Sequence, residues 1–492
     1  MAGIGFELKK LFEKKGLFAI ARAYGYSGIV CTGPMLLGIL LLLGIKLLSI
    51  YGGASVHHSE LLNCMITYTL VASLLISNLL SMVSTRFLAD ALYEDKDNLV
   101  MPCYYGSISI MLVLGCVIYG IFLWYAGIPV LYQFLCLFLF AELVVVWTQI
   151  NFLTAVKDYK GILLTFLFAI ILVFMSGFLL LNIGCPTIFA LLLSVTLGYG
   201  IMMVWYHMLL IDHFPQGKGS AFYFLRWVDR YPALTFLSEF LVLGLFVHII
   251  LMWYGPIGFQ VQGLFYGAPT YDIPAEVAFL SILITTVNFV TSVEVNFYPK
   301  YYTYFSLHNQ GGCITDIEQV ELEMFQTLAK ELSYTFIKQL LTTVFFIILG
   351  AVFIPKLPLY FSDDMMRNYQ ILCLGYAFYA IGNCVMLCSL YFSDNSGALL
   401  SGFFFALISI GGTIFFMNNE QRYYGVGFLL AGFVYTIISL LRLEYFLKRL
   451  KYYVLSRQPI VLRERRMLFT IVSEALERRY DRKYGTIKET NS

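Results

Sequence analysis

The chain has 492 residues, of which 60% are hydrophobic and only 13% are charged, with a formal net charge of +2 at pH 7. Ordinary soluble domains contain about 45–50% apolar and about 25% charged residues, so this composition excludes a soluble enzyme and an extended, highly charged nucleic-acid binder. It indicates a polytopic membrane protein, because a dozen spans of about 20–25 residues would use nearly all of the apolar residues.

Apolar runs predict an all-α membrane protein with twelve transmembrane helices in two six-helix lobes. A cytoplasmic amphipathic N-terminus (1–23) precedes an N-terminal lobe (24–211), and a cytoplasmic linker (212–232) leads to a C-terminal lobe (233–446) and a basic amphipathic cytoplasmic tail (447–492). The twelve predicted spans are residues 24–50, 61–88, 100–125, 130–156, 162–181, 187–211, 233–254, 277–298, 335–354, 369–392, 397–417 and 425–446. The first apolar run is too long for a cleaved signal peptide, so we expect this span to be retained.

Lysine and arginine set the expected orientation of these spans. When the N-terminus is placed in the cytoplasm, all but four of the 32 Lys and Arg residues fall on the cytoplasmic side. The exceptions are Lys46, Lys356, Arg367 and Arg422. Because cytoplasmic loops of membrane proteins are enriched in Lys and Arg, we expect both termini to be cytoplasmic.

Two segments outside the spans have the apolar periodicity of surface helices. Residues 316–339 place Ile317, Met324 and Leu328 at helical spacing among acidic residues. The tail carries a similar apolar stripe beside a basic group that is formed by Arg463, Arg465 and Arg466. A basic amphipathic helix fits either an anionic leaflet or a partner protein, and the sequence leaves both interpretations open.

Several kinds of catalytic site have no counterpart in the sequence. There is no G-x-x-x-x-G-K-[ST] motif, the histidines are scattered, and no loop is large enough for a nucleotide-sugar domain. We therefore expect no catalytic residues, no metal site and no cofactor.

Polar residues inside the spans are the candidates for a substrate path, because an ionisable group at the bilayer centre costs about 2.5–3.5 kcal/mol on insertion scales. Glu142 lies midway along the fourth span with Gln149 two turns further on. We hypothesise that Glu142 faces an internal cavity and contacts a polar substrate or takes up a proton. A structural carboxyl group, either neutral or hydrogen-bonded to another helix, is the equal alternative.

The remaining path candidates lie in three other spans, and of these Arg86, Glu239 and Glu294 are near span ends. Asn78 and Arg86 are in the second span, Glu239 is in the seventh, and Asn288 and Glu294 are in the eighth. For Arg86, a side chain that reaches the lipid headgroups is the favoured alternative. A repeated hydroxyl stripe in the second span (Ser73, Ser77, Ser81 and Ser84) suits close helix packing slightly better than a hydrated cavity.

An ideal helix gives the eighth span two distinct polar faces. Thr285, Asn288, Ser292 and Asn296 share one face, and Glu294 points nearly opposite. Glu294 therefore cannot line the same groove as these residues without a bend in the helix.

The opening residues 1–10 (MAGIGFELKK), followed by residues 22–26 (RAYGY) and 32–34 (TGP), resemble the start of the PelG family of exopolysaccharide transporters. Residues 85–90 (TRFLAD) and 271–274 (YDIP) look like the same family. The resemblance implies a fold of the multidrug/oligosaccharidyl-lipid/polysaccharide exporter superfamily, with two lobes around a central cavity.

The resemblance also implies a function and partners. It implies export of a Pel-type polymer rich in N-acetylgalactosamine across the bacterial cytoplasmic membrane while a PelF-like cytoplasmic glycosyltransferase extends it. It further implies assembly with a PelD-like cyclic-di-GMP receptor and other Pel membrane components. The alternatives are an ion-coupled antiporter or flippase for a lipid-linked sugar or small molecule and, third, a membrane-embedded transferase. The sequence does not determine the energy source, which is either polymerisation or proton coupling through a carboxylate such as Glu142.

Overall fold

Six long helices make up the first half of the described chain. The computed structural model describes residues 37–156, 158–214, 217–356, 361–456 and 467–484. A helix over Leu37–Tyr51 is followed by α3 (Val56–Tyr93), α4 (Val100–Tyr125), α5 (Val130–Val156), α6 (Tyr159–Asn182) and α7 (Thr187–His213). The short helix α8 (Leu225–Arg230) then leads into α9 (Pro232–Trp253).

The second half begins with a small β-hairpin and continues as helices. The hairpin pairs β1 (Phe259–Gln262) with β2 (Phe265–Gly267) in antiparallel register. The following helices are α10 (Pro269–Phe279), α11 (Leu283–Ser292), α12 (Tyr298–Gln310), α13 (Ile314–Phe353), α14 (Asp363–Tyr391), α15 (Asn395–Met417), α16 (Val426–Leu447), α17 (Leu450–Ser456) and α18 (Leu468–Tyr484).

Within the described residues, eleven helices are long and apolar enough to cross a membrane. They coincide with the second to twelfth predicted spans, and α4 and α5 match the predicted bounds to the residue. Leu37–Tyr51 is the described part of the first predicted span. Its residues 24–36, with the Gly-Pro interruption at 33–34, lie outside the described residues.

The two largest differences from the predicted boundaries are in the eighth and ninth spans. The eighth span begins at Pro269, eight residues before the predicted start, because Tyr271, Asp272 and Pro274 make its first turns too polar for hydropathy to detect. Residues 316–339 are not a separate surface helix. They form the first half of the continuous helix α13, which has no proline and whose one glycine, Gly350, lies near its end.

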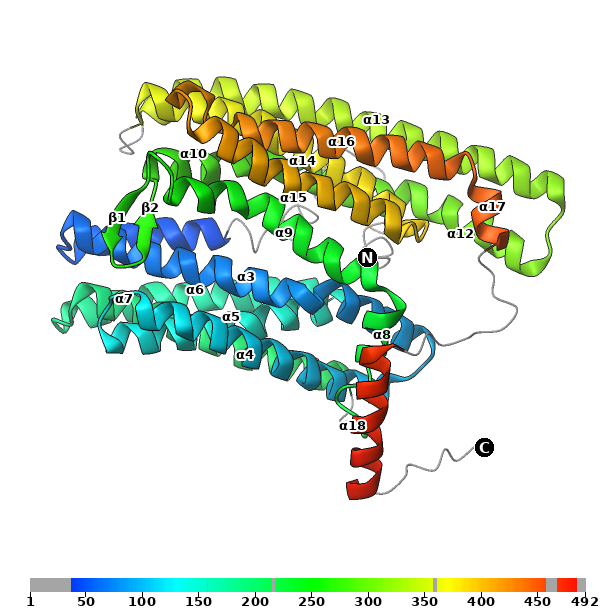
Figure 1. Cartoon of the computed structure of the whole chain (residues 1–492), viewed down its shortest axis with the longest axis horizontal. Coiled ribbons are helices and arrows are strands. Elements are labelled where there is room, and N and C mark those ends of the chain that lie inside the picture. The colour runs from blue at the N-terminus through cyan, green and yellow to red at the C-terminus, as the bar shows by residue number, and fades with distance from the viewer. Residues whose placement is uncertain (1–36, 157, 215–216, 357–360, 457–466, 485–492) are drawn as a thin grey trace, which may run out of the picture. The chain divides into compact units, whose positions relative to one another are not determined.

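Helix α13 is twice as long as a membrane crossing requires. Its 40 residues extend for about 60 Å, against a hydrocarbon thickness of about 30 Å. All of its charged residues except Lys338 lie in its first half, which indicates that this half extends beyond the lipid, with α12 packed alongside it (Figure 1). We call α12 and the first half of α13 the acidic hairpin, because Asp316, Glu318, Glu321, Glu323 and Glu331 lie on it.

The chain folds into two compact units. The N-terminal unit contains Leu40–Leu243, the hairpin residues Phe259–Gly267 and the described part of Arg449–Ser492. The C-terminal unit contains Gly244–Gly258, Ala268–Lys448 and the described part of Met1–Ile39. The division falls inside α9, and α18 belongs to the N-terminal unit although it follows the last span in sequence.

The two units repeat a three-helix arrangement. In the N-terminal unit α7 packs against both α5 and α6, and in the C-terminal unit α16 packs against both α14 and α15. Asp158 caps α6 by accepting a hydrogen bond from Gly161 N at 2.9 Å, and Asp394 caps α15 by accepting one from Gly397 N at 3.2 Å. Both caps have the sequence Asp-x-x-Gly and occupy the same place in the arrangement.

A π-helical turn at Val293–Phe297 joins α11 to α12. Pro299 follows within the first turn of α12. Because proline lacks an N–H and its ring clashes with the carbonyl group four residues earlier, the preceding turn widens from α to π geometry. This turn contains Glu294, so the chain departs from the ideal helix on which the sequence analysis placed this residue opposite to Asn288.

Candidate functional site

Helices α3 and α5 are joined by hydrogen bonds between polar side chains. Trp147 Nε1 donates to Ser73 Oγ at 3.0 Å, and Asn151 Nδ2 donates to Ser81 Oγ at 2.9 Å. Ser73, Ser77 and Ser84 are buried. The hydroxyl stripe therefore mediates helix packing, as the favoured interpretation of the sequence predicted.

Gln149 ties three helices of the N-terminal unit together. Its Nε2 donates to Tyr104 Oη of α4 at 2.9 Å and to the Met203 carbonyl of α7 at 3.0 Å. Gln149 is buried, and its Oε1 has no hydrogen-bond partner among the described residues. The predicted path residue thus has a structural role, with one acceptor still unused.

Glu142 points from α5 toward α7. A Cβ atom built on Gly200 of α7 would lie 2.9 Å from Glu142 Oε1, so the missing side chain of Gly200 makes room for the carboxyl group. Glu142 Oε2 is buried and has no hydrogen-bond partner in the described part of the chain. A buried carboxyl oxygen without a partner costs free energy, which a bound proton, cation or polar substrate would recover.

A second partnerless carboxyl group lies on α9. Glu239 Oε2 and Thr235 Oγ1, one turn apart, are both buried without hydrogen-bond partners among the described residues. Between them in sequence, Ser238 Oγ donates to the Asn78 carbonyl oxygen of α3 at 2.7 Å. Asn78 Nδ2 donates to the Leu74 carbonyl of its own helix at 2.9 Å. Asn78 therefore helps to position α9 beside α3.

Arg86 lies at the end of α3 and is exposed. It forms an ion pair with Asp90 one turn later at 3.1 Å, and its guanidinium lies 5.3 Å from the Tyr231 ring centroid. This placement fits the alternative of an interfacial cation better than a residue deep in a path.

A polar seam joins α11 to α13 in the C-terminal unit. Lys338 Nζ donates to Asn288 Oδ1 at 2.5 Å, and Asn288 Nδ2 lies 3.5 Å from Thr335 Oγ1. Thr285 hydrogen-bonds to Gln339, which donates to Thr343 Oγ1 at 2.9 Å. The predicted face of the eighth span thus contacts α13.

The seam continues past the π-helical turn and contains residues that the sequence analysis missed. Asn296 Nδ2 donates to Glu331 Oε1 at 2.8 Å. Glu331, Thr335, Gln339 and Thr343 recur every four residues on α13, a periodicity that is visible in the sequence. The side chain of Glu294 lies outside the described residues.

The expected docking residues have different environments. Met324 and Leu328 are buried, so the apolar stripe of α13 packs within the chain and is not available to a partner; this corrects the expectation for both residues. Ile317 is half-buried. Arg463, Arg465 and Arg466 lie outside the described residues.

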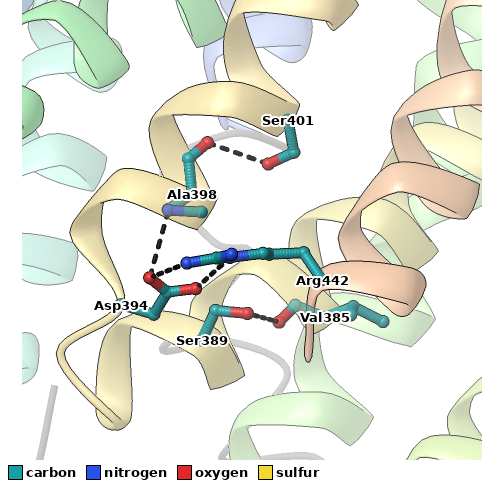
Figure 2. A network of polar contacts seen from close by, with 7 residues as sticks. Val385, Ser389, Asp394, Ala398, Ser401 and Arg442 are labelled. Carbon is teal, nitrogen blue, oxygen red and sulfur yellow. Dashed lines mark hydrogen bonds and ion pairs between the residues drawn. The ribbon is translucent and has the colours of Figure 1, made fainter. Parts of the chain in front are cut away.

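A buried ion pair fixes the loop between α14 and α15 to α16, and the sequence analysis did not identify it. Arg442 donates from Nε to Asp394 Oδ2 at 2.7 Å and from Nη2 to Oδ1 at 2.9 Å. Figure 2 shows the guanidinium of Arg442 facing this carboxylate in a bidentate arrangement. In the N-terminal unit the equivalent carboxylate, Asp158, lies 3.4 Å from His213 Nε2 at the end of α7.

A buried histidine is a second feature that the sequence analysis did not identify. His248 of α9 is buried, its Nδ1 lies 2.8 Å from Tyr271 Oη, and its ring stacks on Phe428 with centroids 4.1 Å apart. Next to Tyr271, Asp272 accepts from Trp253 Nε1 at 3.0 Å. The YDIP segment therefore anchors the start of α10 to α9.

Comparison with known proteins decides the family. A family model described as "PelG: Putative exopolysaccharide Exporter (EPS-E)" matches residues 1–455. The chain belongs to the PelG family. Among curated proteins, no sequence matches it.

Solved structures give the fold of this PelG-family chain. A MATE transporter in the bent conformation superposes with a TM-score of 0.60 at 13% identity, covering 92% of this chain and 99% of the other. An outward-facing multidrug resistance MATE transporter of the MOP superfamily gives 0.56 at 12%, covering 87% and 96%. A MOP superfamily transporter from Pyrococcus furiosus gives 0.56 at 11%, covering 86% and 96%. The expected MATE-like fold is therefore confirmed by these structures, while the family itself comes from the PelG match.

The family and the fold together define the general function. The chain is a multi-pass membrane protein of an exopolysaccharide-exporting family with a transporter fold. The family description indicates a transporter.

Proposed function

We propose that this chain exports a Pel-type, N-acetylgalactosamine-rich polysaccharide across the bacterial cytoplasmic membrane while a cytoplasmic glycosyltransferase extends the polymer. The match to the PelG family over residues 1–455 carries this proposal, because it includes every predicted span. Both termini and the acidic hairpin are cytoplasmic in this proposal, as the distribution of Lys and Arg predicts.

The glycosyltransferase docks on the acidic hairpin. This hairpin extends beyond the lipid, and it exposes large apolar side chains, among them Leu322 and Tyr302, beside its carboxylates. Exposed apolar residues with a charged surround are typical of protein interaction sites. A PelD-like cyclic-di-GMP receptor and other Pel membrane components complete the proposed assembly.

Glu142 serves the transport path in this proposal. Its buried Oε2 has no partner among the described residues, and the carboxyl group lies against Gly200 between α5 and α7. Helix α9 supplies a second such group at Glu239. Intramembrane carboxyl groups without structural partners are suited to proton uptake or to contact with sugar hydroxyls.

Reconstitution tests the proposal. Inside-out vesicles are prepared with this chain, with a PelF-like glycosyltransferase, or with both, and supplied with UDP-N-acetylgalactosamine outside. We expect polymer protected from added glycosidase only when both proteins are present. Protected product from a lipid-linked sugar without the synthase would favour the flippase alternative. Turnover of the activated sugar by this chain alone would favour the transferase.

A further inference from the structure

Helix α18 contacts α8, within the N-terminal unit, through its polar face. Thr470 donates from both its backbone N and its Oγ1 to Asp229 Oδ2 of α8, at 2.6 and 2.7 Å. Arg226 of α8 donates from Nη2 to Glu477 Oε2 at 2.5 Å. Thr470 and Ser473 are buried. These contacts fix which side of α18 faces the rest of the unit.

The opposite side of α18 is apolar and exposed. Leu468, Ile471, Val472 and Ala475 follow the i, i+3, i+4, i+7 spacing of one helix face, which is nearly opposite to Thr470, Ser473 and Glu477. Ile471 is 60% exposed, and Met467, one turn before it, is also exposed. This face lies outside all the candidate spans, so transmembrane burial does not explain it.

The second half of α18 is basic on the same side. Arg478, Arg479 and Arg482 are exposed, whereas Glu477 is paired with Arg226 and Glu474 Oε2 lies 3.5 Å from Arg478. An apolar face that continues into exposed arginines complements the acyl chains and the anionic headgroups of a membrane surface.

Helix α18 lies next to the expected membrane boundary. Helix α8 ends at Arg230, and the membrane-spanning helix α9 begins at Pro232, so α8 is at the edge of the lipid. Helix α18 contacts α8 directly and runs across the long axes of α3 and α4 instead of along them (Figure 1). A helix diameter is about 10–12 Å, so α18 is within reach of the headgroups.

We propose that α18 is an in-plane membrane helix: its apolar face inserts into the headgroup–acyl boundary of the leaflet, and its arginines bind anionic lipid headgroups. Lipid is the occupant that the charge, the crosswise direction and the contact with α8 all favour. A soluble protein covering the same face is the alternative outcome of the test.

The test uses the full chain in nanodiscs of phosphatidylcholine with or without phosphatidylglycerol. Ile471→Cys carries an environment-sensitive NBD label, and Ile314→Cys is the matched control. Ile314 is an isoleucine that is 74% exposed and begins the polar half of α13. The unsubstituted chain, labelled in parallel, gives the background from native cysteines.

We expect brominated lipids to quench the label at 471 at least about threefold more than the label at 314, with iodide showing the reverse order. Changing Arg478, Arg479 and Arg482 together to Gln should remove any increase in lipid quenching that phosphatidylglycerol causes. These side chains are exposed, so the variant should fold, as gel filtration checks. A label at 471 that iodide quenches as strongly as the label at 314 overturns the proposal, as does protection that appears only after a soluble protein is added.

Discussion

The contacts of Glu142 with the described residues leave part of its carboxyl group unexplained. Its carboxyl group occupies the space that Gly200 leaves, and Oε2 gains no hydrogen bond from the described residues. A purely structural carboxyl group would be expected to have a donor, as Asp394 and Asp272 do. The alternative of a hydrogen bond from Oε2 to another helix therefore lacks support.

We predict that Glu142→Gln lowers polymer export by about tenfold or more at normal protein level, because an amide cannot exchange a proton. Gly200→Ala should lower export less, because its Cβ would lie 2.9 Å from Glu142 Oε1 and displace the carboxyl group. Gly120→Ala is the matched control, since nothing lies within 4 Å of its Cβ. Polymer protected in vesicles is the measurement, and full export by Glu142→Gln would contradict a path role.

The two equivalent caps allow the contribution of a buried ion pair to the free energy of unfolding to be measured. Asp394 is fully buried against Arg442, whereas Asp158 and His213 are partly exposed. Asparagine caps helices about as well as aspartate, so both Asp→Asn changes keep the cap and remove only the charge.

We predict that Asp394→Asn destabilises the protein by about 3–5 kcal/mol, because the charge of Arg442 loses its buried counter-ion. Asp158→Asn should cost no more than about 1 kcal/mol. Thermal unfolding of the two purified variants in the same detergent measures the difference. Equal losses of stability would mean that the buried pair contributes nothing beyond the cap.

At the scale of the element, the acidic hairpin has one set of apolar residues that packs inside the chain and another that is exposed. Its apolar stripe was expected to bind a partner, but Met324 and Leu328 are buried in this structure. Periodicity identifies the apolar face of a helix without identifying what covers it. The exposed apolar residues, such as Leu322 at 58%, lie off that stripe.

We predict that Leu322→Asp prevents co-purification of the glycosyltransferase and leaves thermal stability unchanged. Met324→Ala is the contrasting variant: it should reduce stability by about 2–5 kcal/mol, because it leaves a cavity in a packed interface. Affinity pull-down and thermal unfolding are measured on both. If the glycosyltransferase still co-purifies with the Leu322→Asp variant, the hairpin is not the docking surface.

The three-helix repeat is clearer in the structure than in the sequence. Between the second and eighth spans, the sequence contains only a weak correspondence, which matches Asn78, Val83 and Phe87 with Asn288, Val293 and Phe297. The structure instead reveals equivalent caps at Asp158 and Asp394. Apolar helices tolerate many substitutions, whereas a cap requires a specific side chain and a close glycine, so the loops retain the clearer correspondence.

At the scale of the whole molecule, the orientation of the chain in the membrane has a direct test. Cys313 is exposed in the turn of the acidic hairpin between α12 and α13, and Cys185 is half-buried in the turn between α6 and α7. The positive-inside pattern places the first in the cytoplasm and the second outside. A hydrogen bond with the Thr315 hydroxyl lowers the pKa of the Cys313 thiol, which raises its thiolate fraction at neutral pH.

We predict that a membrane-impermeant maleimide labels Cys185 in intact spheroplasts and labels Cys313 only in inside-out vesicles. In those vesicles Thr315→Val should raise the pKa of Cys313, so its labelling should require higher pH. Cys185→Ser is the control that should abolish labelling in spheroplasts. Labelling of Cys313 from outside would reverse the proposed topology.

The sequence by itself determined the membrane class, the positions of the spans and the expected family. Hydropathy is a local property, since about 20 consecutive apolar residues suffice to define a span wherever it packs. The depth of Glu142 and the shared face of Thr285, Asn288 and Asn296 followed from the same local rules.

Only the tertiary structure decided which side chains meet. Asp394 and Arg442 are 48 residues apart, and Gln149 reaches Met203 across 54 residues, so no periodicity connects either pair. Hydropathy could not show that α13 is one helix or that α18 joins the N-terminal unit. Helix continuity depends on the absence of a breaker and docking depends on complementary side chains, and neither changes the apolar content of a segment.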